Sequence, residues 1–170
     1  VEHAERHMQN KYHRISVSAP RLDLFQNVDP DRLRRSSIAA NRAMEPIMKY
    51  MDTGEIKWTV AAGASELWAG SLFPDLPMSE AMAELWDKIF AACRISEDGG
   101  AVEAWLEHDA KLKAHEKWLN SQQFSYLHYE APGTDFKVGL AERHNWIGGS
   151  SLTPDGISYM ANMPTEEIFT

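Results

Sequence analysis

Two adjacent glutamates are the residues in this sequence with the clearest capacity for chemistry. Glu166 and Glu167 stand in the stretch Pro-Thr-Glu-Glu-Ile-Phe-Thr, which is rich in residues that favour extended structure. Alternation along a strand would point the two carboxylates to opposite faces. We therefore expect one of them to enter a site and the other to stay at the surface or in a salt bridge. Such a pair is also typical of a solvated chain end, so the pattern alone leaves both interpretations open.

The histidines and the single cysteine could also do chemistry, but their sequence positions indicate structural roles. His3 and His7 are spaced as metal ligands on a helix can be, but the glutamate between them is not where a His-Glu-x-x-His motif requires it. His108 and His115 fall on an apolar helical stripe, which predicts packed or rim positions. Cys93 lies on the stripe of another helix and is interpreted as a small buried hydrophobic residue.

Polar pairs on the predicted helix that carries His108 and His115 indicate ordinary helix-surface contacts. Glu107 and Lys111, like Glu116 and Asn120, are four residues apart, the spacing of neighbours on one helical face. No glycine-rich phosphate-binding motif is present in the sequence, and neither is Gly-x-Ser-x-Gly.

The composition describes an acidic chain with enough apolar residues for a core. The 170 residues include 17 aromatic side chains, from six Trp, five Tyr and six Phe, and carry a net charge of −8. This charge argues against nucleic-acid and membrane partners, because both need clustered Lys and Arg. A single cysteine suits a reducing compartment, and no apolar run reaches transmembrane length. We expect a cytoplasmic protein.

Hydrophobic periodicity predicts a mixed α/β fold in which helices and strands alternate at first. Helices are expected over 1–11, 22–28, 29–51, 66–72, 79–93 and 101–120, and strands over 13–19, 56–62, 126–130 and 135–140, with short extended stretches at 146–149, 157–161 and 166–169. Asp29 and Ser79 are the expected helix caps, and Pro46 should kink or break its helix.

Near residue 123 the expected elements change from alternating helices and strands to strands alone, which suggests two regions. Residues 1–122 are interpreted as part of an N-terminal α/β domain. Residues 123–170 are interpreted as the start of a β-rich catalytic domain, a β-meander that delivers a carboxylate to a site built mostly by residues outside this sequence. The first residues are helical and the last are extended, so we expect a piece of a longer protein.

Several blocks in order resemble one enzyme family. They are Trp58-Thr-Val, Leu67-Trp-Ala, Phe73-Pro-Asp, Ala131-Pro-Gly-Thr-Asp-Phe and Asn162-Met-Pro-Thr-Glu-Glu-Ile-Phe-Thr. Together they are similar to the thermophilic-type metalloaminopeptidases of peptidase family M29, across nearly the whole chain. The Pro-Gly-Thr-Asp and Asn-x-Pro-x-x-Glu blocks are the most specific part of the resemblance.

The resemblance implies a metal-dependent hydrolase that removes N-terminal residues from peptides with a water activated by two divalent ions (zinc, cobalt or manganese). It implies that Glu167 is the first metal ligand and that Glu166 is its neighbour. The other ligands and the catalytic residues have no counterpart in this segment, so we expect the 170 residues alone to bind no metal and to be inactive. For the full-length protein a homodimer is expected.

Two alternatives stay open on the residues alone. The chain could be a non-enzymatic α/β interaction or oligomerisation module, in which the glutamate pair is a surface end. An acyl-transfer hydrolase using Ser or Cys is a further alternative, which covalent labelling by a serine- or cysteine-directed probe would indicate.

Overall fold

The computed structural model describes residues 2–19, 21, 23–166 and 168–169, without the side chains of residues 2, 3 and 169. Its helices are α1 (Glu2–Gln9), α2 (Pro30–Asp52), α3 (Glu66–Leu72), α4 (Met78–Ala92) and α5 (Ala101–Gln122). Its strands are β1 (Arg14–Ser18), β2 (Trp58–Ala62), β3 (Tyr126–Ala131), β4 (Thr134–Gly139), β5 (Ile147–Gly148), β6 (Ser151–Leu152), β7 (Ser158–Tyr159), β8 (Asn162–Met163) and β9 (Ile168–Phe169). The predicted mixed α/β class is confirmed.

The chain divides into two compact units, which are described separately. One consists of Val1–Gly99 and Ser150–Thr165, and the other of Gly100–Gly149 and Glu166–Thr170. The predicted domains, 1–122 and 123–170, refer to a longer protein and stay a prediction. None of the helices in the described part of the chain is long and apolar enough to cross a membrane.

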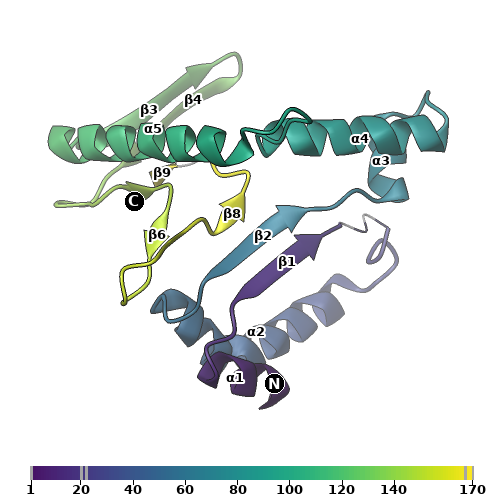
Figure 1. The fold of residues 1–170 in the computed structure, drawn as a ribbon, viewed down its shortest axis with the longest axis horizontal. Coiled ribbons are helices and arrows are strands. Elements are labelled where there is room, and N and C mark those ends of the chain that lie inside the picture. The colour runs from purple at the N-terminus through teal and green to yellow at the C-terminus, as the bar shows by residue number, and fades with distance from the viewer. Residues whose placement is uncertain (1, 20, 22, 167, 170) are drawn as a thin grey trace. The chain divides into compact units, whose positions relative to one another are not determined.

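The first unit is organised around a parallel sheet in the order β1-β2-β8 (Figure 1). β1 and β2 pair along their whole length, from Arg14 opposite Trp58 to Ser18 opposite Ala62. The short β8 adds to the other edge of β2, with Val60 opposite Asn162. Periodicity along the chain did not indicate this last pairing, because it joins residues that are far apart in sequence.

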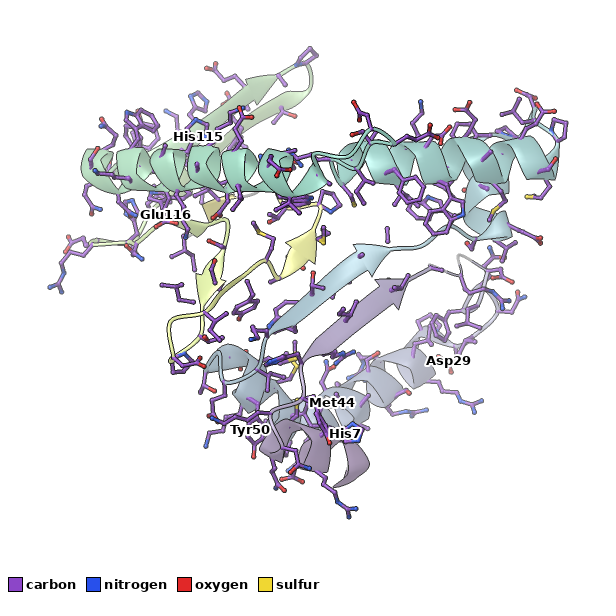
Figure 2. The ribbon with its side chains drawn as sticks, viewed as in Figure 1. His7, Asp29, Met44, Tyr50, His115 and Glu116 are labelled. Atoms are coloured by element: carbon purple, nitrogen blue, oxygen red, sulfur yellow. The ribbon has the colours of Figure 1, made fainter. Side chains whose placement is uncertain are left out.

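Helix α2 begins where the Asp-Pro pair predicts. The carboxylate of Asp29 accepts a hydrogen bond from the backbone N–H of Asp31 at 2.8 Å. The expected break at Pro46 is absent, because α2 continues through it to Asp52. The next residue, Ile47, is fully buried with Met8 and Ile56, and this cluster holds the helix on both sides of the proline. Figure 2 labels two further residues that pack against the cluster, Met44 and Tyr50.

The main apolar core of this unit lies between α3 and α4. Its buried members come from α3, from α4 and from the residue that caps the end of α4: Ala69, Ala81, Leu85, Ile89 and Cys93. The predicted cap at Ser79 is wrong, because α4 begins at Met78 after an N-cap residue, Pro77, that makes no side-chain cap hydrogen bond. A proline there starts the helix through its fixed φ.

Two further predictions fail in local detail. Residues 23–27 form turns rather than a helix, with i→i+3 hydrogen bonds such as Val28 N–H to Phe25 O, while Leu22 lies outside the described residues. The predicted β-meander is also wrong. β3 and β4 form a hairpin, and the later strands are two-residue pairs in different sheets. After Gln122 the described residues contain no helix.

Candidate functional site

The glutamate pair lies in the second unit, where one of its two members can be described. Glu166 stands before β9, outside any strand, and Glu167 lies outside the described residues. The Oε2 atom of Glu166 is 3.6 Å from Nε2 of His108 on α5. The His108 side chain is 11 % exposed and that of Glu166 is 59 % exposed. One member of the pair therefore lies against α5.

On the other side of Glu167, the chain is held by strand pairing. β9 pairs antiparallel with β5, with Ile168 opposite Gly148 and Phe169 opposite Ile147. The carboxylate of Glu116 on α5 accepts a hydrogen bond from the N–H of Gly148 at 3.1 Å. The same Glu116 oxygen is 2.9 Å from Nζ of Lys113. Figure 2 labels Glu116 on the α5 helix.

A second link joins α5 to the residues just before β5. Asn120 donates to the carbonyl of Trp146 at 2.9 Å, and its own amide oxygen accepts from the Trp146 N–H at 2.7 Å. Trp146 is 6 % exposed, so this link is shielded from water. Because the amide pairs with both backbone groups of one residue, it determines where β5 begins along α5.

The two polar pairs predicted for the surface of this helix differ in outcome. Lys111 does pair with Glu107 at 2.7 Å, and its hydrogen bond and its charge lower the pKa of that carboxyl below its usual value. Glu116 and Asn120 instead bind the backbone of residues 146–148, so the surface interpretation was wrong for them. The backbone contacts of Glu116 and Asn120 were not predicted, because spacing along a helix does not show which segment packs against it.

Of the two histidines predicted at packed or rim positions on α5, His108 is packed, whereas His115 is exposed. His108 is mostly buried, and its ring contacts Trp105 edge to face at a centroid distance of 5.8 Å. His115 is exposed on the same helix (Figure 2). His7 contacts Tyr12 edge to face at 5.2 Å, and the side chain of His3 lies outside the described part.

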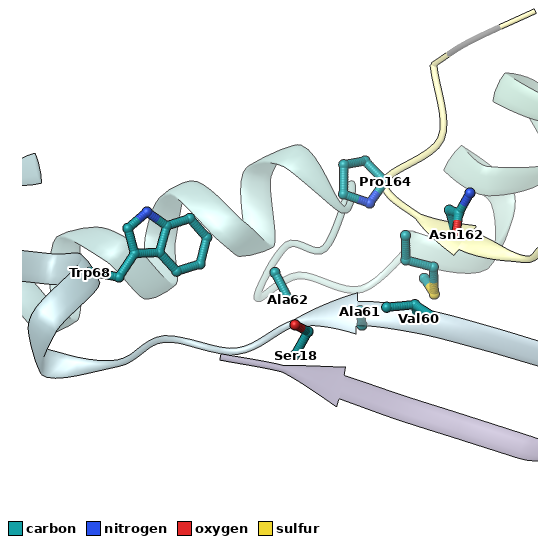
Figure 3. A pocket seen from close by; sticks show the side chains of 8 residues that line it. Ser18, Val60, Ala61, Ala62, Trp68, Asn162 and Pro164 are labelled. Carbon is teal, nitrogen blue, oxygen red and sulfur yellow. The ribbon is translucent and has the colours of Figure 1, made fainter. Parts of the chain in front are cut away.

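The Asn-x-Pro block belongs to the first unit and lines a cavity of about 320 Å³ (Figure 3). The cavity lies where β1, β2 and β8 end, a frequent ligand position in open parallel sheets. Residues from all three strands line it together with a tryptophan from α3: Ser18, Val60, Ala61, Ala62, Trp68, Asn162, Met163 and Pro164. The lining is mostly apolar, with the Ser18 hydroxyl and the Asn162 amide as its polar side-chain groups.

The donor types in the second unit suit a divalent metal, but their number does not complete a site. Carboxylate and imidazole groups are ordinary ligands of zinc, and a catalytic zinc needs three protein ligands. Among the described residues no group of three or more His, Cys, Asp or Glu side chains could hold a metal ion. These residues could therefore supply part of a metal site, and no reaction step follows from them alone.

Comparison with known proteins identifies the family. The family model of the thermophilic metalloproteases (M29) matches residues 1–170. This chain belongs to the M29 family.

Similar M29 proteins carry consistent names. The chain is 39 % identical over 156 residues to aminopeptidase AmpS of Bacillus subtilis (strain 168), covering 92 % of this chain and 38 % of that protein. It is 39 % identical over 164 residues to aminopeptidase PepS of Streptococcus thermophilus, covering 96 % of this chain and 40 % of that protein. Wild-type AmpT from Thermus thermophilus has a similar structure, with a TM-score of 0.85 and 34 % identity, covering 98 % of this chain and 40 % of that chain. The M29 chain described here therefore spans about 40 % of the length of these relatives.

Proposed function

We propose that the protein containing this chain is a metal-dependent aminopeptidase that hydrolyses N-terminal residues from peptides. The observation that carries the proposal is the match of the M29 family model to all 170 residues. The relatives named aminopeptidases, at 35–39 % identity, support the same activity. Peptides are accordingly the proposed substrates.

Within this enzyme, Glu167 is the proposed metal ligand and Glu166 its neighbour. The contact of Glu166 with His108 supports this division, because a carboxylate held against α5 is less available to a metal. No catalytic residue is assigned to this chain. We further propose that residues 1–122 are part of an N-terminal α/β domain and that 123–170 begin the β-rich metal-binding domain. The absence of helix after Gln122 in the described residues supports that boundary.

Two divalent ions, zinc, cobalt or manganese, are the proposed cofactors of the whole enzyme. When bound, such ions lower the pKa of a water molecule and polarise the scissile carbonyl. The 170 residues by themselves are proposed to bind none of these ions, because a metal site needs three or more protein ligands and the family resemblance gives this chain one.

We propose a cytoplasmic enzyme, because a single cysteine suits a reducing compartment. The net charge of −8 supports the absence of nucleic-acid and membrane partners. We also propose that the full-length protein is a homodimer, on the basis of the family resemblance.

The test is a pair of substitutions in the full-length enzyme. We expect Glu167→Ala to abolish release of N-terminal residues and to reduce bound metal, measured by elemental analysis after dialysis. Glu166→Ala should be milder and should weaken metal affinity by about tenfold, the lower end of the about 10- to 100-fold effect that partners of metal ligands have. Glu142→Ala, at an exposed position in the same unit, is the matched control and should behave as wild type. Wild-type activity in Glu167→Ala would contradict the ligand assignment.

A further inference from the structure

The backbone on both sides of Glu167 is held by one helix, α5. Before it, Glu166 contacts His108 at 3.6 Å. After it, Ile168 pairs with Gly148, whose N–H donates to Glu116 of α5 at 3.1 Å. α5 therefore makes contacts on either side of Glu167, directly at Glu166 and through β5 at Ile168.

His108 is suited to hold a mobile partner. Its side chain is only 11 % exposed, and the edge-to-face contact with Trp105 restricts rotation of the imidazole. Glu166 is 59 % exposed, and a long exposed side chain ordinarily samples many rotamers. A contact between a confined ring and a flexible carboxylate restricts the carboxylate, and with it the adjoining backbone.

Other contacts fix the position of residues 146–149 against α5. Asn120 holds both backbone groups of Trp146, at 2.7 and 2.9 Å. Gly149 lies so close to α5 that an added Cβ would come within 3.3 Å of Cβ of Leu112. These contacts fix the position of β5 along α5 and its distance from the helix. Because β5 pairs with β9, they also fix the position of Ile168.

We infer that His108 is a positioning residue of this enzyme, which holds Glu166 and thereby the backbone next to the proposed metal ligand, Glu167. The inference rests on the proposed function. It assigns His108 no contact with substrate or metal, and it gives Glu166 a role of its own as the link between helix and ligand. Residues that orient a ligand in this way typically change metal affinity by about 10- to 100-fold when they are removed.

The test is a double-mutant cycle in the full-length enzyme, with His108→Ala, Glu166→Ala and both together. Affinity for Co²⁺ is measured by calorimetry on metal-free enzyme, and the visible spectrum of the Co²⁺ enzyme reports ligand geometry. Each single substitution should weaken Co²⁺ binding by about tenfold and shift the spectrum. The double variant should be no weaker than either single one, because the two residues act through one contact. His108→Gln, which keeps an N–H donor, should recover most of the affinity.

The control is His115→Ala, an exposed histidine on the same helix, which should match wild type in affinity and spectrum. If His108→Ala does not fold, Glu166→Ala tests the contact from its exposed side. Unchanged Co²⁺ affinity and spectrum in Glu166→Ala, with metal lost in Glu167→Ala, would overturn the positioning role and leave the proposed function standing. Fully additive losses in the double variant would overturn it as well. Retention of metal and activity by Glu167→Ala would instead contradict the proposed function.

Discussion

The thiol of Cys93 is made unreactive by its position in the apolar core. It ends α4 with 3 % exposure and packs in the core with Leu85 and Ile89. Burial raises the pKa of its thiol, while the nearby charge of Arg94 opposes that shift only in part. The thiolate is the nucleophile, so a raised pKa leaves less of the reactive form near neutral pH. The sequence-based interpretation of Cys93 as a small buried hydrophobic residue is confirmed.

We expect the native chain to react with a thiol reagent such as DTNB at pH 8 at least about tenfold more slowly than the chain in 6 M guanidinium chloride, because of burial and the raised pKa. The control is the double variant Ala91→Cys/Cys93→Ala, which moves the thiol to an exposed position on the same helix. That variant should react at nearly the same rate in both conditions. Equal rates for native and denatured wild type would show that Cys93 is accessible.

Helix α5 lies very close to the segment around Gly149. It follows two glycines with positive φ, Gly99 at 86° and Gly100 at 80°, and at its far end it contacts the residues around β5. Gly149 has φ of 70°, and a Cβ there would meet Oδ1 of Asp109 at 2.5 Å and Cβ of Leu112 at 3.3 Å. Both the backbone conformation and the space require glycine at this position.

Gly149→Ala should destabilise the folded chain by about 1–3 kcal/mol, because alanine is strained at positive φ and the added methyl group would displace Asp109 or Leu112. Urea denaturation followed by far-UV circular dichroism measures this free energy of unfolding. Gly139→Ala is the matched control, since a Cβ at that strand position meets nothing within 4 Å. If the two substitutions cost the same, α5 and Gly149 do not approach as closely as the structure shows.

The hairpin β3–β4 is an element with two different faces. Its register places Leu127, Tyr129, Phe136 and Val138 on one face, and His128, Lys137 and Asp135 on the other. The polar face is internally paired, with Nε2 of His128 2.8 Å from Oδ1 of Asp135. On the apolar face Tyr129 and Phe136 stack at 6.2 Å but stay 51 % and 58 % exposed.

At the scale of the whole molecule, the 170 residues leave apolar surface uncovered. Parallel sheets are ordinarily covered on both faces, yet Ile15 and Val17 of β1 are 79 % and 69 % exposed. The apolar face of the hairpin is a second such surface. Exposed apolar patches favour association, and the chain spans only about 40 % of the length of its relatives.

We therefore expect the 170-residue chain to self-associate at high concentration, with the apolar hairpin face of one copy packing against that of a second copy. Phe136→Thr should weaken association by about tenfold, or 1.4 kcal/mol, because it removes an aromatic ring and keeps a residue suited to a strand. Lys137→Thr, on the opposite face, should leave association unchanged. Light scattering and sedimentation velocity measure the outcome, and a monodisperse monomer of the wild-type chain would contradict it.

Most local elements and the family follow from the amino-acid sequence. Asp29-Pro30, Gly99-Gly100 and the stripe of α4 mark their elements through short-range effects: capping, positive φ and helical period. Failures at this level came from turns and caps, as at Ser79, where several local arrangements have similar energies. The family resemblance needed only the order of its blocks, and the match over residues 1–170 confirms it.

The contacts of the polar groups in the candidate site depend on tertiary packing and do not follow from sequence patterns. Asn120 binds Trp146 across 26 residues of sequence, and Glu116 binds Gly148 across 32. Helical spacing shows which residues share a face, but it does not show which distant segment packs there. Such contacts depend on how β5, β9 and α5 pack together, so the role proposed for His108 could not be inferred from its position in the sequence.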